Sequence, residues 1–208
     1  MSDAADFRAS RNLIVAPRRD LCFDFVNTLA WRGSAPAESL HTIADLLGWL
    51  AAASAMPARA IGELSKWFAA HPAPAATVFS AALEIRETLY RLLRAVATAS
   101  HPARADLRRL NHALNDTAPR VTLDGADNRF GWRIEARPTV TGMLAPVLWS
   151  AADIIVGADA ARVRQCANDR CLWLFLDDSK NGTRRWCSMQ ACGNRAKAHR
   201  HYLRQKGQ

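Results

Sequence analysis

Apolar residues recur every three or four positions over most of the chain, a spacing typical of amphipathic helices. After Ser39, which is placed to cap a helix, four apolar residues share one face: Ile43, Leu46, Leu47 and Leu50. The same pattern predicts five helices before the last quarter of the chain. They cover about 39–50, 57–71, 75–99, 102–115 and 142–157.

Local signals set the expected ends of these helices. An Ala/Pro stretch at 72–76 is expected to connect the second helix to the third, and Ser100 to cap the fourth. Pro146 is expected in the first turn of the fifth, where no partner for its missing N–H is needed. Within the third helix, Glu87 and Arg91 are spaced for an ion pair across one turn.

One strand signal interrupts the helices. Alternating side chains at 120–123 and 129–136 flank Asp124-Gly125, which predicts a β-hairpin. The fold class is therefore mainly α: a helical N-terminal domain with one small β-hairpin, followed by a C-terminal module of different composition.

Charge separates the two parts of the chain. The 208 residues hold 28 Lys and Arg against 19 Asp and Glu. Residues 1–161 hold 17 basic and 16 acidic side chains, whereas residues 162–208 hold 11 and 3. We therefore expect two domains, 1–161 and 162–208, with the second binding a polyanion. A solvated basic tail is the alternative.

The C-terminal segment also carries four of the five cysteines. Cys166 and Cys171 form one C-x4-C pair, Cys187 and Cys192 form another, and fifteen residues separate the pairs. Two close pairs are the layout of a tetrahedral zinc site that is closed, and therefore structural rather than catalytic. A disulfide framework and an iron–sulfur cluster are the alternatives. Cys22 stands alone and is expected to be a small buried apolar residue.

The segment between the pairs predicts a zinc-ribbon-like hairpin. Strands are expected at 172–176 and 183–186, joined by a turn at Asn181-Gly182. A final helix is expected at 195–206 with Asn194 as its N-cap.

At this point the sequence resembles two known families. The end of the chain is similar to the CGNR zinc finger over Phe175, 177–181 (DDSKN), 184–189 (RRWCSM), 192–195 (CGNR) and Lys197. Segments 21–28 (LCFDFVNT) and 31–33 (WRG) resemble the opening of the ABATE domain, which accompanies such fingers in stress-induced bacterial transcription regulators. One departure is Lys180, where the family pattern leads us to expect Arg.

The resemblance implies one structural Zn²⁺ held by Cys166, Cys171, Cys187 and Cys192, and a role in DNA binding. Basic side chains of the module are the expected nucleic-acid contacts: Arg184, Arg185, Arg195, Lys197, Arg200 and Arg204. The helical domain is expected to sense a signal or to assemble subunits, with a homodimer as one form. A zinc-stabilised module that docks on RNA or protein, without sequence-specific DNA recognition, is the alternative function.

The N-terminal domain offers one polar cluster in an apolar run: Asp24, Asn27 and Arg32, which are expected to line a pocket for a small-molecule effector unless they cap helices or pair internally. No G-x-S-x-G, phosphate loop, dinucleotide glycine pattern or H-E-x-x-H occurs, so we do not expect an enzyme. Without a signal-peptide core or a long apolar run, we expect a cytoplasmic protein that does not engage a membrane.

Overall fold

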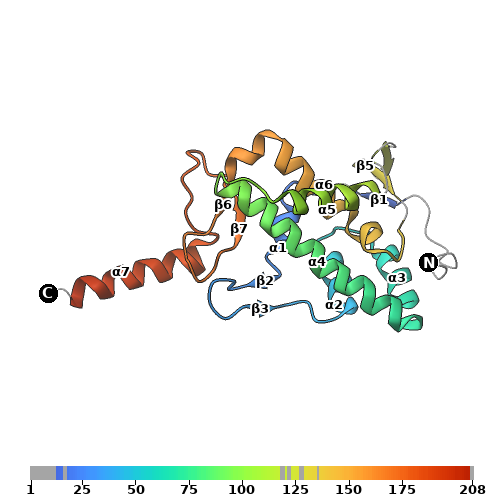
Figure 1. The fold of residues 1–208 in the computed structure, drawn as a ribbon, viewed down its shortest axis with the longest axis horizontal. Coiled ribbons are helices and arrows are strands. Elements are labelled where there is room, and N and C mark those ends of the chain that lie inside the picture. The colour runs from blue at the N-terminus through green and yellow to red at the C-terminus, as the bar shows by residue number, and fades with distance from the viewer. Residues whose placement is uncertain are drawn as a thin grey trace.

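The structure is a computed structural model that describes residues 13–15, 18–117, 120, 123–126, 129–134 and 136–206. Its α-helices are α1 (Leu21–Val26), α2 (Ile43–Ala52), α3 (Ala58–Ala70), α4 (Pro72–Ala97), α5 (Arg104–Asn115), α6 (Val140–Val156) and α7 (Asn194–Lys206). The mainly helical prediction is confirmed. The long helix α4 crosses the molecule, while α7 extends away from the body at one end (Figure 1).

Side-chain caps fix the starts of α2 and α6. Thr42 accepts a hydrogen bond from Asp45 N (3.2 Å) and Asp45 Oδ2 accepts one from Thr42 N (2.8 Å), which together form a capping box. The expected cap Ser39 instead donates its hydroxyl to a backbone carbonyl (2.7 Å). Thr139 caps α6, which therefore starts early enough to put Pro146 in its second turn rather than its first.

The starts of α4 and α5 also differ from the prediction. α4 begins at Pro72, because a proline at the first helical position lacks only an N–H that has no partner within the helix. The expected connector at 72–76 is thus helical. α5 follows Ala103 without a side-chain cap, since the Ser100 hydroxyl is hydrogen-bonded to the Thr98 hydroxyl (3.0 Å).

The core forms around α6, which is buried on nearly every side. Four of its large side chains have no exposed surface: Met143, Leu144, Val147 and Leu148. α1, α4 and α5 pack against it. α1 is absent from the predicted helices because five of its six residues are buried, so it shows no alternation of apolar and polar positions. No helix in the described part of the chain has the length and apolar character needed to cross a bilayer.

Cys22 on α1 lies fully inside this core. Its backbone N–H donates to Ser150 Oγ on α6 (3.1 Å). Burial raises the pKa of the Cys22 thiol to about 12. The prediction of a small buried apolar residue is confirmed.

Small antiparallel strands complete the fold. They are β1 (Leu13–Val15), β2 (Leu29–Ala30), β3 (Ala37–Glu38), β4 (Leu123–Ala126), β5 (Arg129–Ile134), β6 (Val163–Gln165) and β7 (Leu174–Leu176). They pair as β1-β5-β4, β2-β3 and β6-β7. The N-terminal hairpin is present, but Asp124-Gly125 is not its turn, because the register pairs these residues with Gly131 and Phe130 inside the strands. Positions 121, 122 and 135 of the predicted strands lie outside the described residues.

A network of charged side chains ties α4 to the N-terminal segment. Arg86 is only 3% exposed, and its guanidinium donates to both oxygens of Glu38 (2.6 and 2.7 Å) and to Glu87 (3.0 Å). Burial alone raises the pKa of each glutamate. The arginine hydrogen bonds and charges outweigh it, so both pKa values lie below their usual value.

The expected pair between Glu87 and Arg91 does not form. Glu87 faces Arg32, which binds both of its oxygens (2.6 and 3.1 Å). Arg91 pairs with Asp106 on α5 (2.7 Å). Helical spacing predicts contacts between side chains on one helix, whereas Glu87 and Arg91 each pair with a residue on another part of the chain.

Arg86→Met is expected to lower the free energy of unfolding at pH 7 by about 2 kcal/mol, because it leaves the Glu38 carboxylate without its main partner and removes one of the two arginines that bind Glu87. The glutamate pKa values are depressed in the folded state, so the pairs stabilise the fold above the unfolded value of about 4.3. That stability is lost as the pH falls through the folded pKa values.

Urea unfolding at pH 7 and pH 3.5 tests this, with Arg59→Met, at an exposed position on α3, as the control. The gap between wild type and Arg86→Met should narrow at the lower pH, and Arg59→Met should stay within about 0.5 kcal/mol of wild type. An equal difference in free energy of unfolding between wild type and Arg86→Met at both pH values would contradict the role of the glutamate–arginine pairs.

Candidate metal centre

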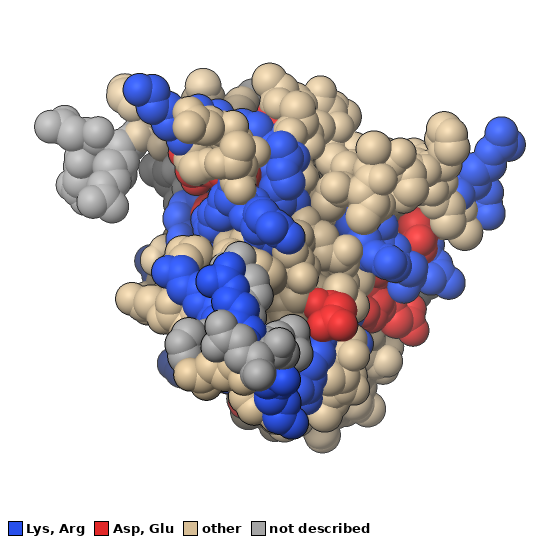
Figure 2. Space-filling model, turned by 90° about the vertical axis from the view of Figure 1, so that its left-hand side faces the viewer, with Lys and Arg blue, Asp and Glu red and all other residues tan. Residues whose placement is uncertain are grey.

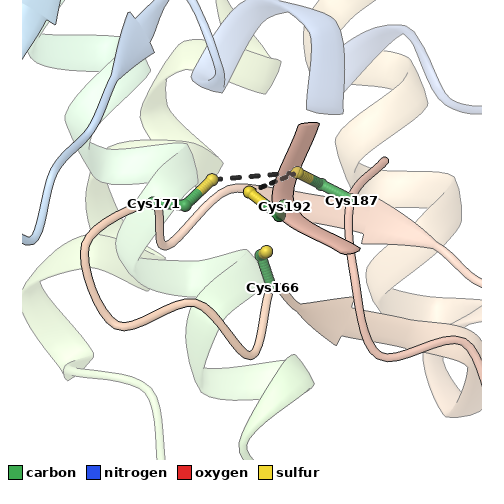
Figure 3. A group of neighbouring side chains, drawn as sticks. All are labelled: Cys166, Cys171, Cys187 and Cys192. Carbon is green, nitrogen blue, oxygen red and sulfur yellow. Dashed lines mark hydrogen bonds between the residues drawn. The ribbon is translucent and has the colours of Figure 1, made fainter. Parts of the chain in front are cut away.

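Four cysteine side chains from separate parts of the C-terminal segment meet at one point (Figure 3). Their sulfur atoms all lie within 4.8 Å of one another. The Sγ atom of Cys187 is 3.7 Å from that of Cys171 and 3.7 Å from that of Cys192. Sulfurs bound to one zinc ion at about 2.3 Å lie about 3.8 Å apart in a regular tetrahedron. The cluster has the dimensions of a tetrahedral zinc site, and all its cysteines are free thiols rather than disulfides.

Two tight turns carry the cysteine pairs. In the first, the backbone N–H groups of Cys171 and Leu172 donate to Asn168 O (2.9 and 3.2 Å). In the second, Ser188 caps a π-helical turn, Met189–Gly193, that leads directly into α7. The expected N-cap Asn194 already has helical backbone angles, because that turn leaves it no role as a cap.

The strand partner within the module differs from the prediction. β7 pairs with β6, which precedes the first cysteine, and residues 183–186 are not a strand. The fully buried Asp177 explains the difference, because its carboxylate accepts from Ser179 N (3.0 Å), Ser179 Oγ (2.5 Å) and Arg184 N (2.9 Å). These bonds, that of the Ser179 hydroxyl above all, lower the Asp177 pKa and fold the returning chain into a loop.

The thiols influence one another strongly. A hydrogen bond from Cys187 lowers the pKa of Cys166 to about 5, whereas burial raises the pKa of Cys171 to about 12. The pKa of Cys187 is raised by its bond to Cys166, by burial and by the neighbouring sulfurs. Four sulfurs that all carried charge would repel one another in this largely buried space, and a divalent cation compensates such a donor set.

The N-terminal segment binds the module through its backbone. The Asn27 side chain donates to Leu174 O (2.8 Å) and accepts from Leu174 N (3.1 Å), so it pairs with β7 as a neighbouring strand would. Tyr90 on α4 donates its hydroxyl to Leu172 O (3.0 Å), next to the first cysteine turn. Both contacts fix the module against α1 and α4.

Loop 31–33 forms one wall of the metal centre. Trp31 packs against the cysteine cluster, and Arg32 stacks on the Tyr90 ring (3.9 Å to its centroid). Gly33 N donates to Arg170 O (3.2 Å). A Cβ atom at Gly33 would lie 1.8 Å from the backbone oxygen of Asp169, so no other residue fits without moving the cysteine turn.

Comparison with known families separates the same two parts of the chain. The ABATE family, described as "Putative stress-induced transcription regulator", matches residues 19–158. The chain belongs to the ABATE family. Its C-terminus carries a CGNR zinc finger, matched over residues 162–205. Neither description names an enzymatic activity, and no curated protein matches the chain at a significant level.

The CGNR finger and the sulfur geometry together establish one structural zinc ion, with Cys166, Cys171, Cys187 and Cys192 around it. Four sulfur ligands leave zinc no open position for a water molecule, so the metal organises the finger rather than performing chemistry.

The structure brings only two of the three residues expected to line an effector pocket to the same hollow. Asp24 is exposed and pairs with Arg18, while Arg32 is occupied by Glu87 and by the backbone oxygen of Val26. Asp24 and Asn27 border a hollow of about 220 Å³, which Arg32 does not line. The effector pocket stays a prediction.

The six expected nucleic-acid contacts fall into different settings. Arg184 is exposed, but its guanidinium is already bonded within the finger: it donates to the backbone oxygens of Trp186 (2.9 Å) and Cys187, and it stacks on Phe175. Arg185 and Arg195 are exposed and lie over the rings of Trp186 and Trp31. Lys197 and Arg204 are exposed on α7. The side chain of Arg200 lies outside the described ones.

Two residues that the sequence analysis did not single out as contacts line a hollow beside Arg195. Arg170 lies in the first cysteine turn, and Trp31 reaches the finger from the ABATE domain. Arg170 stands alone in sequence between an acidic residue and a cysteine, so no local pattern marks it. Trp31 belongs to the 31–33 motif, but only the fold shows that this motif contacts the finger.

Gly33→Ala is expected to destabilise the protein by about 3 kcal/mol, because its methyl group collides with backbone rather than with a mobile side chain. Gly62→Ala on α3 is the control, since nothing lies within 4 Å of its added Cβ and alanine favours helix. Thermal unfolding of the zinc-loaded proteins measures both. Equal melting temperatures for the two variants would contradict the close fit at Gly33.

Cys187→Ser is expected to lower bound zinc from one ion per chain to none, because three cysteines hold the metal less tightly and serine is a poor zinc ligand. Limited proteolysis should then cut the segment after β7, while β6 and β7 stay protected by their contacts with α1 and α4. Cys22→Ser is the control and should retain zinc. Full zinc in Cys187→Ser would remove Cys187 from the ligand set.

Proposed function

We propose that this protein is a DNA-binding transcription regulator that contacts DNA through the CGNR finger and α7. The observation that carries the proposal is the projecting helix itself. Its 13 residues include five Lys and Arg and no Asp or Glu. A helix with this composition, held at its base and with the basic side chains that the structure describes exposed, has the charge to contact a phosphate backbone.

The zinc site holds the base of this helix. Cys192 lies in the π-helical turn that continues into α7, and Asn168 Nδ2 on the first cysteine turn donates to Cys192 Sγ (3.4 Å). Metal binding therefore fixes the direction of α7 relative to the rest of the finger. A rigid helix loses less conformational entropy on docking into a groove than a flexible tail would.

The surrounding surface is also basic. Figure 2 looks onto the end that carries α7 and shows Lys and Arg side chains gathered over this face. Four thiolates and Zn²⁺ add −2 to the finger's balance of 11 basic against 3 acidic residues, which leaves about +6. A polyanion would be attracted to this face before any specific contact forms.

Positions on α7 divide into two faces. Lys197, Arg200 and Arg204 recur at three-to-four spacing and form one stripe, which we assign to the DNA backbone or major groove. Arg195 lies about half a turn away, beside Trp31. Arg185 adds a charge next to the finger, whereas Arg184, which is bonded to the backbone oxygens of Trp186 and Cys187, is assigned to holding the second cysteine turn.

The ABATE domain is proposed to sense a signal or to assemble subunits. A hollow of about 240 Å³ between α4, α5 and α6 supports the first role. Leu89, Leu110 and Leu148 give it an apolar floor, and Arg109 and His112 lie at its border. This combination of apolar surface with a few polar groups is typical of small-molecule sites.

Binding of duplex DNA is expected to weaken with salt, with a log–log slope of about −4.5 if Arg185, Arg195, Lys197, Arg200 and Arg204 each contact one phosphate. Replacing Lys197 and Arg204 by Gln should make the slope less steep by about 2. Replacing Arg104 and Arg108 by Gln, two exposed residues on α5, is the charge-matched control. Fluorescence anisotropy of a labelled duplex at several salt concentrations measures the slope.

Competition with structured RNA of equal length distinguishes the alternative function. Duplex DNA should displace the labelled probe at lower concentration than RNA does. A salt slope near zero would overturn the DNA-binding proposal, and stronger competition by RNA would assign the finger to RNA.

A further inference from the structure

A hollow of about 400 Å³ lies where the ABATE domain meets the finger. Trp31 from the ABATE domain and Trp186 from the finger contribute aromatic surface. Arg170 from the first cysteine turn and Arg195 from the first turn of α7 contribute guanidinium groups, and Asp169 contributes a carboxylate. Its volume is within the range of small-molecule binding sites.

We propose that this hollow binds one unpaired nucleotide, with the base stacked on tryptophan and the phosphate held by arginine. The inference rests on the proposed function in one respect: DNA is the source of the nucleotide only if the protein binds DNA. A base displaced from DNA and a free nucleotide present the same chemistry, a planar ring joined to an anion.

The aromatic groups favour a planar ligand. Trp31 is partly exposed, and its indole ring already has a guanidinium on it, that of Arg195 at 4.6 Å from the ring centroid. Bases stack on tryptophan rings and on guanidinium planes with little dependence on sequence. Both kinds of surface are therefore present at this one site.

The charges favour an anion joined to that ring. The side chains of Arg170 and Arg195 are exposed, and neither forms an ion pair within the described part of the chain. A planar guanidinium binds phosphate oxygens through two parallel hydrogen bonds. The Asp169 carboxylate can accept hydrogen bonds from the amino groups of a base. A purely apolar ligand would make no use of these charges.

The location relates the hollow to α7. The hollow is also lined by Cys192, a zinc ligand, and by Ala196 on α7. A nucleotide bound here would contact loop 31–33 and the finger at once. A paired base cannot enter, because its edge and both faces are occupied within the duplex. The hollow therefore selects bulged, displaced or single-stranded positions.

Zinc-loaded full-length protein tests the proposal with two labelled duplexes, one fully paired and one carrying a single unpaired nucleotide. The second duplex should bind about tenfold more tightly, the size of effect expected from stacking one base. The same titrations should quench tryptophan fluorescence with the unpaired nucleotide only. Titration with nucleoside 5′-monophosphates in the absence of DNA shows whether a free nucleotide is enough to quench the tryptophan fluorescence.

Arg170→Gln is the main variant. The hydrogen bonds that this exposed residue forms with the described part of the protein involve its backbone, so the substitution should leave the fold intact. It should reduce the preference for the unpaired nucleotide at least threefold while leaving the fully paired duplex within twofold of wild type. Arg108→Gln is the matched control and should keep the full preference. Trp186→Leu, with zinc content measured, tests the stacking surface by a second route.

Each result of these titrations either supports or contradicts the proposal. Normal binding of paired DNA with no preference and no quenching by any nucleotide overturns the inference and leaves the proposed function intact. Quenching by monophosphates that depends on Arg170, without binding to either duplex, supports the hollow as a free-nucleotide site and overturns the proposed function. An equal preference in Arg170→Gln and wild type places the unpaired base elsewhere.

Discussion

Contacts from residues of the ABATE domain to main-chain atoms of the finger determine how the two parts of this protein are placed against each other. Asn27 binds both backbone groups of Leu174, Tyr90 binds the carbonyl of Leu172, and Gly33 approaches Asp169 too closely for a side chain. Contacts to the main chain fix the position of a segment more closely than contacts between long side chains do. The finger therefore cannot turn relative to α1 and α4 without breaking several bonds together.

Zinc and the ABATE core share the task of folding the finger. On its inner side, Val163, Leu174 and Leu176 belong to the same apolar cluster as α4 and α6. On its outer side, the apolar side chains that join the cysteines within the described residues are Phe175, Trp31, Trp173 and Trp186, which is too little apolar surface to hold a chain of this length. The charge boundary near residue 161 thus lies within continuous packing, and the metal stabilises the part that the core does not reach.

Sequence reasoning succeeds here where the decisive interaction is local. The apolar spacing predicts α2 to α6, and the two C-x4-C pairs predict the zinc site, because both patterns are set by neighbours in the chain. The prediction is wrong where the partner is distant. β7 pairs with β6 across the first cysteine pair, and Glu87 pairs with Arg32 rather than with Arg91 on its own helix.

The candidate site shows the same limit. Spacing identifies the four ligands, but it does not distinguish Arg184, turned toward the carbonyls of the second cysteine turn, from the outward Lys197. Nor does it show that the 31–33 motif lies against the metal centre, since Cys166, the first zinc ligand, comes 135 positions after Trp31 in the chain. Those relations follow from the folded chain alone.

The enclosed position of Cys22 has a practical consequence for the chemistry of this protein. A thiol with a pKa of about 12 is almost entirely protonated at neutral pH, and its surroundings exclude bulky reagents. Alkylation of the folded chain therefore reports on the four sulfurs at the zinc site without interference from the fifth. The number of modified sulfhydryls, read as a mass increment, then serves as a direct gauge of how much metal the finger has lost.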